Sequence, residues 1–134
     1  MEAESIARRA AEAAVDELAR NVVIIDLREK SDAVDFFVLC SALSDMHIRA
    51  VLSGIEAELG NQGIKPHHRE GQAGSKWMLL DYIDVVIHVF HPTTREFYAI
   101  EELWGDAPIE RFDDGPSLPA GFSEDDRDDD IDYS

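Results

Sequence analysis

A chain of 134 residues that is 45% apolar has the size and composition of one globular domain, and it contains no run of about 20 apolar residues that would predict a membrane span. Its 12 basic and 29 acidic residues give a net charge of −17, which disfavours direct binding to nucleic-acid phosphates and suits a basic partner. Cys40 is the single cysteine, so no intrachain disulfide is expected, and the N-terminus lacks the character of a signal or transit peptide, which favours a cytoplasmic location.

The first third of the chain predicts one helix followed by two strands. Residues 4–20 are rich in alanine, with apolar residues near helical spacing, and this helix should end near Asn21. Residues 22–27 and 35–40 are β-branched or apolar and predict strands, which the short connection should make antiparallel. The second of these strands is apolar almost throughout, so we expect it to be buried on both faces.

The middle of the chain predicts a second helix and a short strand. Residues 47–59 have an apolar stripe at helical spacing, with Ser44 or Asp45 as the N-cap and Gly60 as the residue that ends the helix. Residues 64–70 read as a short polar strand that contains a proline, which favours an edge position in the sheet.

The most informative block of the chain predicts a β-hairpin that runs directly into a helix. Residues 77–82 and 85–90 are the two strands, and a last helix begins at Pro92 and ends before Gly105. Because successive strand residues point to opposite faces, the first strand should divide its side chains in two. One face then carries Trp77, Leu79 and Asp81, and the other carries Met78, Leu80 and Tyr82.

Taken together, these elements predict an α/β fold: a mixed β-sheet of about five strands with flanking helices. The helix between the second and third strands permits a parallel crossover. We expect the folded domain to cover residues 1–112. Residues 113–134 hold nine acidic residues and one basic residue and predict an acidic, disordered C-terminal tail.

Few residues in the chain suggest catalysis. Asp81 and Asp84 could hold a divalent metal for nucleotidyl transfer, but they lie three residues apart across a turn, where aspartate commonly makes local hydrogen bonds. The histidines do not define a four-ligand metal site, and Cys40 lies in an apolar strand where a thiol is usually inert. We therefore predict no catalytic residue, no metal site and no cofactor. The histidines are His47, His67, His68, His88 and His91.

The aromatic residues are the stronger signal. Trp77, Tyr82, Tyr98 and Trp104 lie on consecutive predicted elements, and tryptophan and tyrosine are the residues that most often anchor protein interfaces. Burial in the core is an equally reasonable position for either tryptophan, because tryptophan is highly buried on average.

Several segments of the chain closely resemble the ribosomal silencing factor family, RsfS, also called Iojap. The residues that carry the resemblance are 77–92 and 95–108, with earlier matches at 35–40 and 44–50. These segments occur in the family's order and spacing, so the resemblance covers about residues 5–112 and leaves the acidic tail outside it.

This resemblance implies a nucleotidyltransferase-like fold that has lost its catalytic machinery, and therefore a protein that is not an enzyme. Members of the family bind large-subunit ribosomal protein fourteen, a basic protein on the intersubunit face of the large ribosomal subunit. They thereby block joining of the small subunit and repress translation when nutrients are limited. An acidic chain suits such a partner, although the charge alone does not identify it.

The family's binding surface transfers to a set of residues in the hairpin and the last helix. Apolar anchoring falls to Trp77, Leu79 and Tyr98, and Asp81 would pair with an arginine or lysine of the partner. Leu79 and Tyr82 should point to opposite faces, so one of them is expected in the core. The full set is Trp77, Met78, Leu79, Asp81, Tyr82, His91, Tyr98 and Glu101.

Three other readings stay open at this point. One is an active nucleotidyltransferase that uses Asp81 or Asp84 with a divalent metal. Another is an acidic module for a different basic protein, and a third is a homodimer formed through the aromatic residues.

Overall fold

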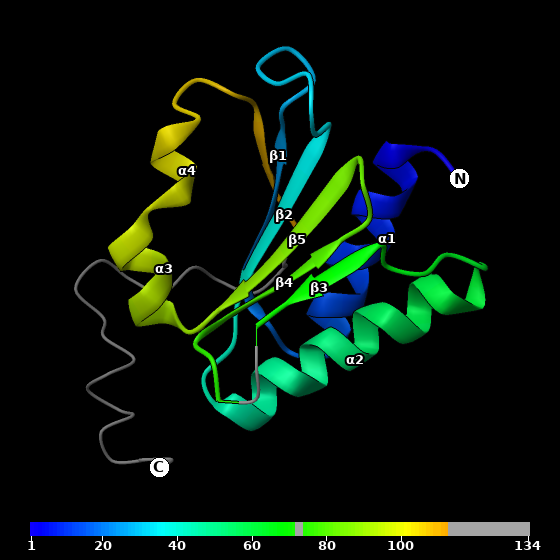
Figure 1. Ribbon diagram of the computed structural model, residues 1–134. Helices are drawn as coiled ribbons and strands as arrows, with labels where there is room; N and C mark the ends of the chain where they lie inside the picture. The colour runs from blue at the N-terminus through cyan, green and yellow to red at the C-terminus, as the bar shows by residue number, and fades with distance from the viewer. Residues whose placement is uncertain (72–73, 113–134) are drawn as a thin grey trace.

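The computed structural model describes residues 1–71 and 74–112, so the predicted acidic tail lies outside the described residues (Figure 1). The chain forms an α/β fold, as predicted. Its elements in chain order are α1 (Ala3–Asp16), β1 (Arg20–Asp26), β2 (Phe36–Ser41), α2 (Asp45–Asn61), β3 (His68–Glu70), β4 (Trp77–Asp81), β5 (Val85–Phe90), α3 (Pro92–Tyr98), α4 (Ile100–Leu103) and β6 (Ile109–Arg111).

The strands form one mixed sheet in the order β3-β4-β5-β2-β1-β6. β1 and β2 are antiparallel and β3 lies at an edge, which confirms both predictions. β2 and β5 are parallel neighbours. Between them the chain passes through α2 and then forms β3 and β4 at the edge of the same sheet. The prediction of about five strands missed β6, which gives the described part of the chain a six-stranded sheet.

Helices cover both faces of this sheet. α1 and α2 lie on one side, and α3 and α4 lie on the other (Figure 1). The first face holds the larger core, where the alanines of α1 let the helix backbone approach the sheet closely. The second face has a smaller core, made of Ile25, Leu27, Leu39, Phe90, Ile100 and Ala107. None of the helices in the described residues is long and apolar enough to cross a membrane.

The predicted ends of the first two helices need correction. α1 ends at Asp16, and Asn21 lies in β1 with φ 50°, beside an irregularity in the β1–β2 register. Ser44 caps α2, because its hydroxyl oxygen accepts a hydrogen bond from the His47 N–H at 3.0 Å. Gly60 does not end α2. The helix continues to Asn61, and Gly63, with φ 80°, takes the left-handed position while the Ile64 N–H bonds back to the Leu59 carbonyl.

The single helix predicted after Pro92 is broken in two. His91 is the N-cap of α3, and its Nδ1 accepts a hydrogen bond from the Thr93 N–H at 3.3 Å. Ala99 has φ 45° and ψ 49°, a left-handed conformation that ends α3 and begins α4. Alanine has no intrinsic preference for that conformation, so tertiary contacts must hold the break.

The hairpin between β4 and β5 holds a strained residue. The Tyr82 N–H bonds to the Val85 carbonyl at 2.8 Å, and the Asp84 N–H bonds to the Tyr82 carbonyl at 2.9 Å. These bonds hold Ile83 at φ 72° with its side chain 59% exposed. A β-branched residue with positive φ is an outlier that costs on the order of 1 to 3 kcal/mol.

Replacing this residue should therefore stabilise the protein. Ile83→Gly removes the clash of the side chain with its own backbone and sacrifices little buried area, so we expect the free energy of unfolding to rise by about 1 kcal/mol. Urea unfolding with an unchanged m-value measures the difference. Ile109→Gly, at a 48% exposed isoleucine in β6, is the control and should lower stability. A loss of stability in Ile83→Gly would contradict the prediction.

Candidate partner-binding surface

An array of aromatic rings connects the sheet to α3 on its less covered face. Trp77 begins β4 opposite Phe90 of β5, and their ring centroids are 4.9 Å apart. The centroid of the Tyr98 ring lies 4.8 Å from that of Trp77, and the centroid of the Phe97 ring lies 5.0 Å from that of Tyr98. Three consecutive elements, β4, β5 and α3, thus contribute to one group of rings.

The outer members of this array are exposed. Phe97 is 79% exposed and Tyr98 is 50% exposed, whereas Trp77 and Leu79 are half-buried. We call these four residues, Trp77, Leu79, Phe97 and Tyr98, the aromatic surface. Leu103 of α4 is also 75% exposed. The same two short helices carry two exposed acidic residues, Glu96 and Glu102. Such apolar exposure beside acidic side chains is a feature of interaction surfaces.

The predicted alternation along β4 is confirmed. Trp77 packs with the second core, whereas Met78 and Tyr82 are 5% and 6% exposed in the first core, under α1 and α2. Met78 and Tyr82 therefore do not reach the aromatic surface, and Leu79 is the member of the Leu79–Tyr82 pair that stays accessible. The Tyr82 hydroxyl has no hydrogen-bond partner within the described residues, and burial raises its pKa to about 12.

The two candidate metal-binding aspartates occupy the hairpin turn. One carboxylate oxygen of Asp81 accepts a hydrogen bond from the Ile83 N–H at 2.7 Å, as expected for an aspartate that stabilises a turn. Asp84 is exposed, and its backbone carbonyl accepts from the N–H groups of Asp35 and Phe36. The described residues contain no group of three or more His, Cys, Asp or Glu that could hold a metal ion.

Glu101, another predicted contact residue, is already engaged within the fold. Its carboxylate accepts from the Arg95 guanidinium at 2.6 Å and 3.0 Å. The same guanidinium donates to the Asn21 carbonyl at 2.8 Å and to the Ser41 hydroxyl at 3.0 Å. Arg95 thus joins α3, α4, β1 and β2, and it supplies the tertiary contact that accompanies the break at Ala99.

His88 contacts Trp77, a member of the aromatic surface, and sequence reasoning did not select it. It is 4% exposed in β5, and its Nδ1 accepts from the Trp77 indole N–H at 3.1 Å. The Phe37 ring packs edge-on against it at 4.6 Å. The signal available in the sequence was a polar residue that interrupts the apolar run 85–90. Cys40, in the neighbouring strand β2, is also buried. Burial raises the pKa of its thiol to about 12, so the thiol stays neutral and serves only in packing.

Acidification should destabilise the protein through His88. Burial lowers the pKa of His88 from 6.5 to about 4, so between these values the unfolded chain binds a proton that the folded chain does not. The free energy of unfolding therefore falls as pH falls through this window, by on the order of 3 kcal/mol, and the His88 contribution levels off below the folded pKa. Urea unfolding of the wild type and His88→Phe at several pH values checks this, because the difference between them isolates His88 from the carboxylates. Parallel curves would contradict it.

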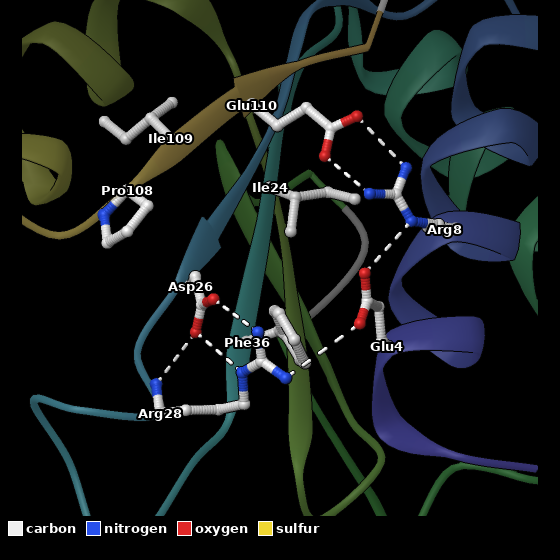
Figure 2. A pocket seen from close by; sticks show the side chains of 9 residues that line it. All are labelled: Glu4, Arg8, Ile24, Asp26, Arg28, Phe36, Pro108, Ile109 and Glu110. Atoms are coloured by element: carbon white, nitrogen blue, oxygen red, sulfur yellow. Dashed lines mark hydrogen bonds and ion pairs between the residues drawn. The ribbon is translucent and has the colours of Figure 1, made fainter.

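A separate pocket lies between α1 and the strands β1, β2 and β6, on the other side of the sheet. Its volume is about 130 Å³ (Figure 2). Ile24, Phe36, Pro108 and Ile109 supply its apolar lining, and charged side chains from α1, β1 and β6 surround them.

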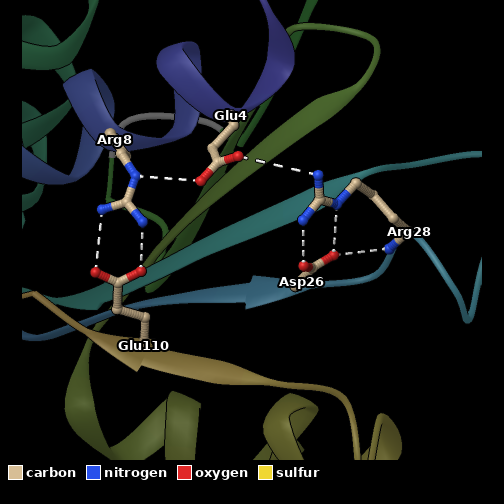
Figure 3. Close-up of polar contacts among 5 residues, drawn as sticks. All are labelled: Glu4, Arg8, Asp26, Arg28 and Glu110. Carbon is tan, nitrogen blue, oxygen red and sulfur yellow. Dashed lines mark hydrogen bonds and ion pairs between the residues drawn. The ribbon is translucent and has the colours of Figure 1, made fainter.

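The charged residues of this pocket pair with one another (Figure 3). Arg8 donates to both carboxylate oxygens of Glu110, at 2.7 Å and 3.0 Å, and to Glu4 at 3.4 Å. Arg28 donates to Asp26 at 2.7 Å and 3.0 Å, which lowers the pKa of that carboxyl, and Glu4 lies 3.9 Å from Arg28. The network links the first helix to the last described strand, so we assign it a structural role.

Comparison with known proteins agrees with the sequence resemblance. The family model described as "Ribosomal silencing factor during starvation" matches residues 1–132. The match therefore extends past residue 112 into the acidic segment, which lies outside the sequence resemblance. The chain is 36% identical over 115 residues to the ribosomal silencing factor RsfS of Bacillus subtilis, which covers 86% of this chain and 98% of that protein.

Two further relatives extend the comparison to structure and to organelles. A crystal structure of a Chromobacterium violaceum protein superimposes with a TM-score of 0.76 at 27% identity, over 92% of this chain and 98% of that one. A mouse protein named "Mitochondrial assembly of ribosomal large subunit protein 1" is 30% identical over 101 residues, 73% of this chain and 43% of that protein. The B. subtilis relative is named as a silencing factor and not as an enzyme. With a family match over nearly its whole length and a relative that it covers almost end to end, the chain belongs to the RsfS family of ribosomal silencing factors.

Proposed function

We propose that this protein binds the large ribosomal subunit through the aromatic surface and prevents the small subunit from joining. Its contact would be the basic large-subunit ribosomal protein fourteen, and its effect would be to repress translation when nutrients are limited. The observation that carries this proposal is the exposure of Phe97 and Tyr98 on a rigid base formed by Trp77 and the sheet.

The chemistry of this surface suits a basic protein with apolar side chains at its contact. Large rings that are already packed lose little conformational entropy on binding, which is why tryptophan and tyrosine dominate interface energies. Exposed Glu96 and Glu102 on the same helices, with Asp81 on the Trp77 face of β4, provide acidic partners for arginine or lysine. The net charge of −17 would accelerate encounter with a basic surface.

The proposed mechanism is steric and needs no catalysis or cofactor. A protein that occupies intersubunit surface on the free large subunit competes with the small subunit, so its binding free energy opposes joining by mass action. We place this action in the cytoplasm. A homodimer through the same aromatic surface would compete with ribosome binding, and sedimentation velocity of the free protein measures its extent.

Sucrose-gradient co-sedimentation with separated ribosomal subunits tests the proposal. We expect the protein to migrate with the large subunit and, when small subunits are added, to reduce the joined ribosome peak. Purified ribosomal protein fourteen should compete for the protein, whereas another basic ribosomal protein of similar charge should not. Absence of binding to the large subunit would overturn the proposal, and equal competition by any basic protein would indicate a general acidic module.

A further inference from the structure

His88 interrupts the apolar strand β5 and is buried. The Phe37 ring lies 4.6 Å away, edge-on, and the Phe90 ring stacks at 5.8 Å with an interplanar angle of 7°. A phenylalanine would fill this space without taking a polar ring out of water. Packing alone therefore does not account for a histidine at this position.

One nitrogen of the His88 ring has a defined partner. The Trp77 indole N–H donates to Nδ1 at 3.1 Å, which places the ring proton on Nε2. That Nε2 is buried and has no hydrogen-bond partner among the residues that the structure describes. The Nε2 N–H thus stays unpaired at an energetic cost, while Nδ1 is kept as an acceptor for the Trp77 indole.

The hydrogen bond acts on the ring that supports the aromatic surface. Trp77 contacts Phe90 at 4.9 Å on the sheet side and Tyr98 at 4.8 Å on the α3 side, and Tyr98 contacts Phe97 at 5.0 Å. Stacking alone leaves an indole free to slide or flip, whereas a hydrogen bond to its single N–H selects one orientation.

We propose that His88 is the positioning residue of the aromatic surface: its Nδ1 holds the Trp77 indole in the orientation on which Tyr98 and Phe97 are presented to the ribosomal partner. This inference rests on the proposed function, because the partner is the large subunit. Burial keeps the pKa of His88 at about 4, so at neutral pH the Nδ1 lone pair is available to accept. His88 itself is too buried to touch the partner.

A double-mutant cycle with Trp77 tests the proposal. His88→Phe keeps a ring and removes the acceptor, His88→Asn keeps an acceptor close to the Nδ1 position, and Trp77→Phe removes the donor. We expect His88→Phe to weaken large-subunit binding about threefold to tenfold, as the loss of one hydrogen bond predicts, and His88→Asn to recover part of it. In the Trp77→Phe background, His88→Phe should have no further effect.

The indole N–H signal of the free protein gives a readout that packing alone would not move. NMR should show the Trp77 indole N–H protected from hydrogen exchange in the wild type and unprotected in His88→Phe. Its absence in Trp77→Phe assigns the signal. Phe37→Leu is the matched control, since it alters the packing on the His88 ring and leaves the hydrogen bond in place. It should retain the protected signal and bind the subunit within about twofold of the wild type.

The outcomes separate this inference from the proposed function. If His88→Phe loses indole protection and still binds the large subunit as the wild type does, the positioning role is overturned while the proposed function stands. An unchanged indole signal in His88→Phe would overturn it directly. A wild-type protein that binds no subunit would overturn the proposed function, and the indole signal would then still decide whether His88 orients Trp77.

Discussion

Trp77→Ala should abolish detectable co-sedimentation with the large ribosomal subunit while the domain stays folded. Trp77 is the base on which Tyr98 rests, so its removal takes away one anchor and releases a second. Truncation of a central interface aromatic typically costs 2 kcal/mol or more, which corresponds to a loss of affinity of about thirtyfold or greater. Gradient co-sedimentation at several protein concentrations measures the change.

Two further variants separate binding from folding in this experiment. Phe97→Asp changes a side chain that is 79% exposed, so it should disrupt the contact without affecting the core. Met46→Ala, at a 71% exposed methionine of α2 on the opposite side of the sheet, should bind like the wild type. Unchanged co-sedimentation of a folded Trp77→Ala protein would rule out this surface as the ribosome contact.

Arg95→Ala should lower the free energy of unfolding by about 3 kcal/mol. Its side chain is 11% exposed and donates to Glu101, to the Asn21 carbonyl and to the buried Ser41 hydroxyl. Removing the guanidinium leaves the half-buried Glu101 carboxylate, the Asn21 carbonyl and the Ser41 hydroxyl without their donor. Removing one partner of a buried ion pair in this way is strongly destabilising. Because α3 and α4 depend on this contact, large-subunit binding should weaken as well. Urea unfolding measures the stability change.

Arg9→Ala is the matched control for charge and residue type. Arg9 pairs with Glu58 at 2.9 Å, but the two side chains are 41% and 37% exposed. An exposed ion pair contributes little after solvent screening and side-chain entropy, so we expect a loss below about 1 kcal/mol. Equal losses in the two variants would show that Arg95 does not hold the short helices on the sheet.

Most of the regular structure could be predicted because its signals are local. The strands at residues 22–27, 35–40, 77–82 and 85–90 were placed within two residues, since β-branched and apolar runs between turn residues define them. The alternation along β4 separated Trp77 and Leu79 from Met78 by geometry that involves only neighbouring residues. Ser44 was one of the two residues predicted to cap α2, for the same reason.

The errors arose where the determining contact is distant in sequence. β6 is three exposed residues without alternation, and it exists as a strand only because it pairs with β1. The break at Ala99 accompanies contacts of Arg95 that lie 54 and 74 residues away. The engagement of the predicted contact residues also depends on distant contacts: Glu101 pairs with Arg95, and Met78 and Tyr82 are buried, while their contact with a partner stays a prediction. The extent of the domain at residues 1–112 stays a prediction.

The sequence by itself determined the family, the order of most of the elements and the two faces of β4, because these depend on residue identity and on spacings of a few residues. Only the tertiary structure decided which aromatic rings reach solvent and which polar groups are engaged inside the fold. Exposure and hydrogen bonding depend on what packs over a residue, and for Trp77 the ring partners come from β5 and α3. That packing buries His88, leaves Phe97 in solvent, and assembles from separate segments the surface on which the proposed function rests.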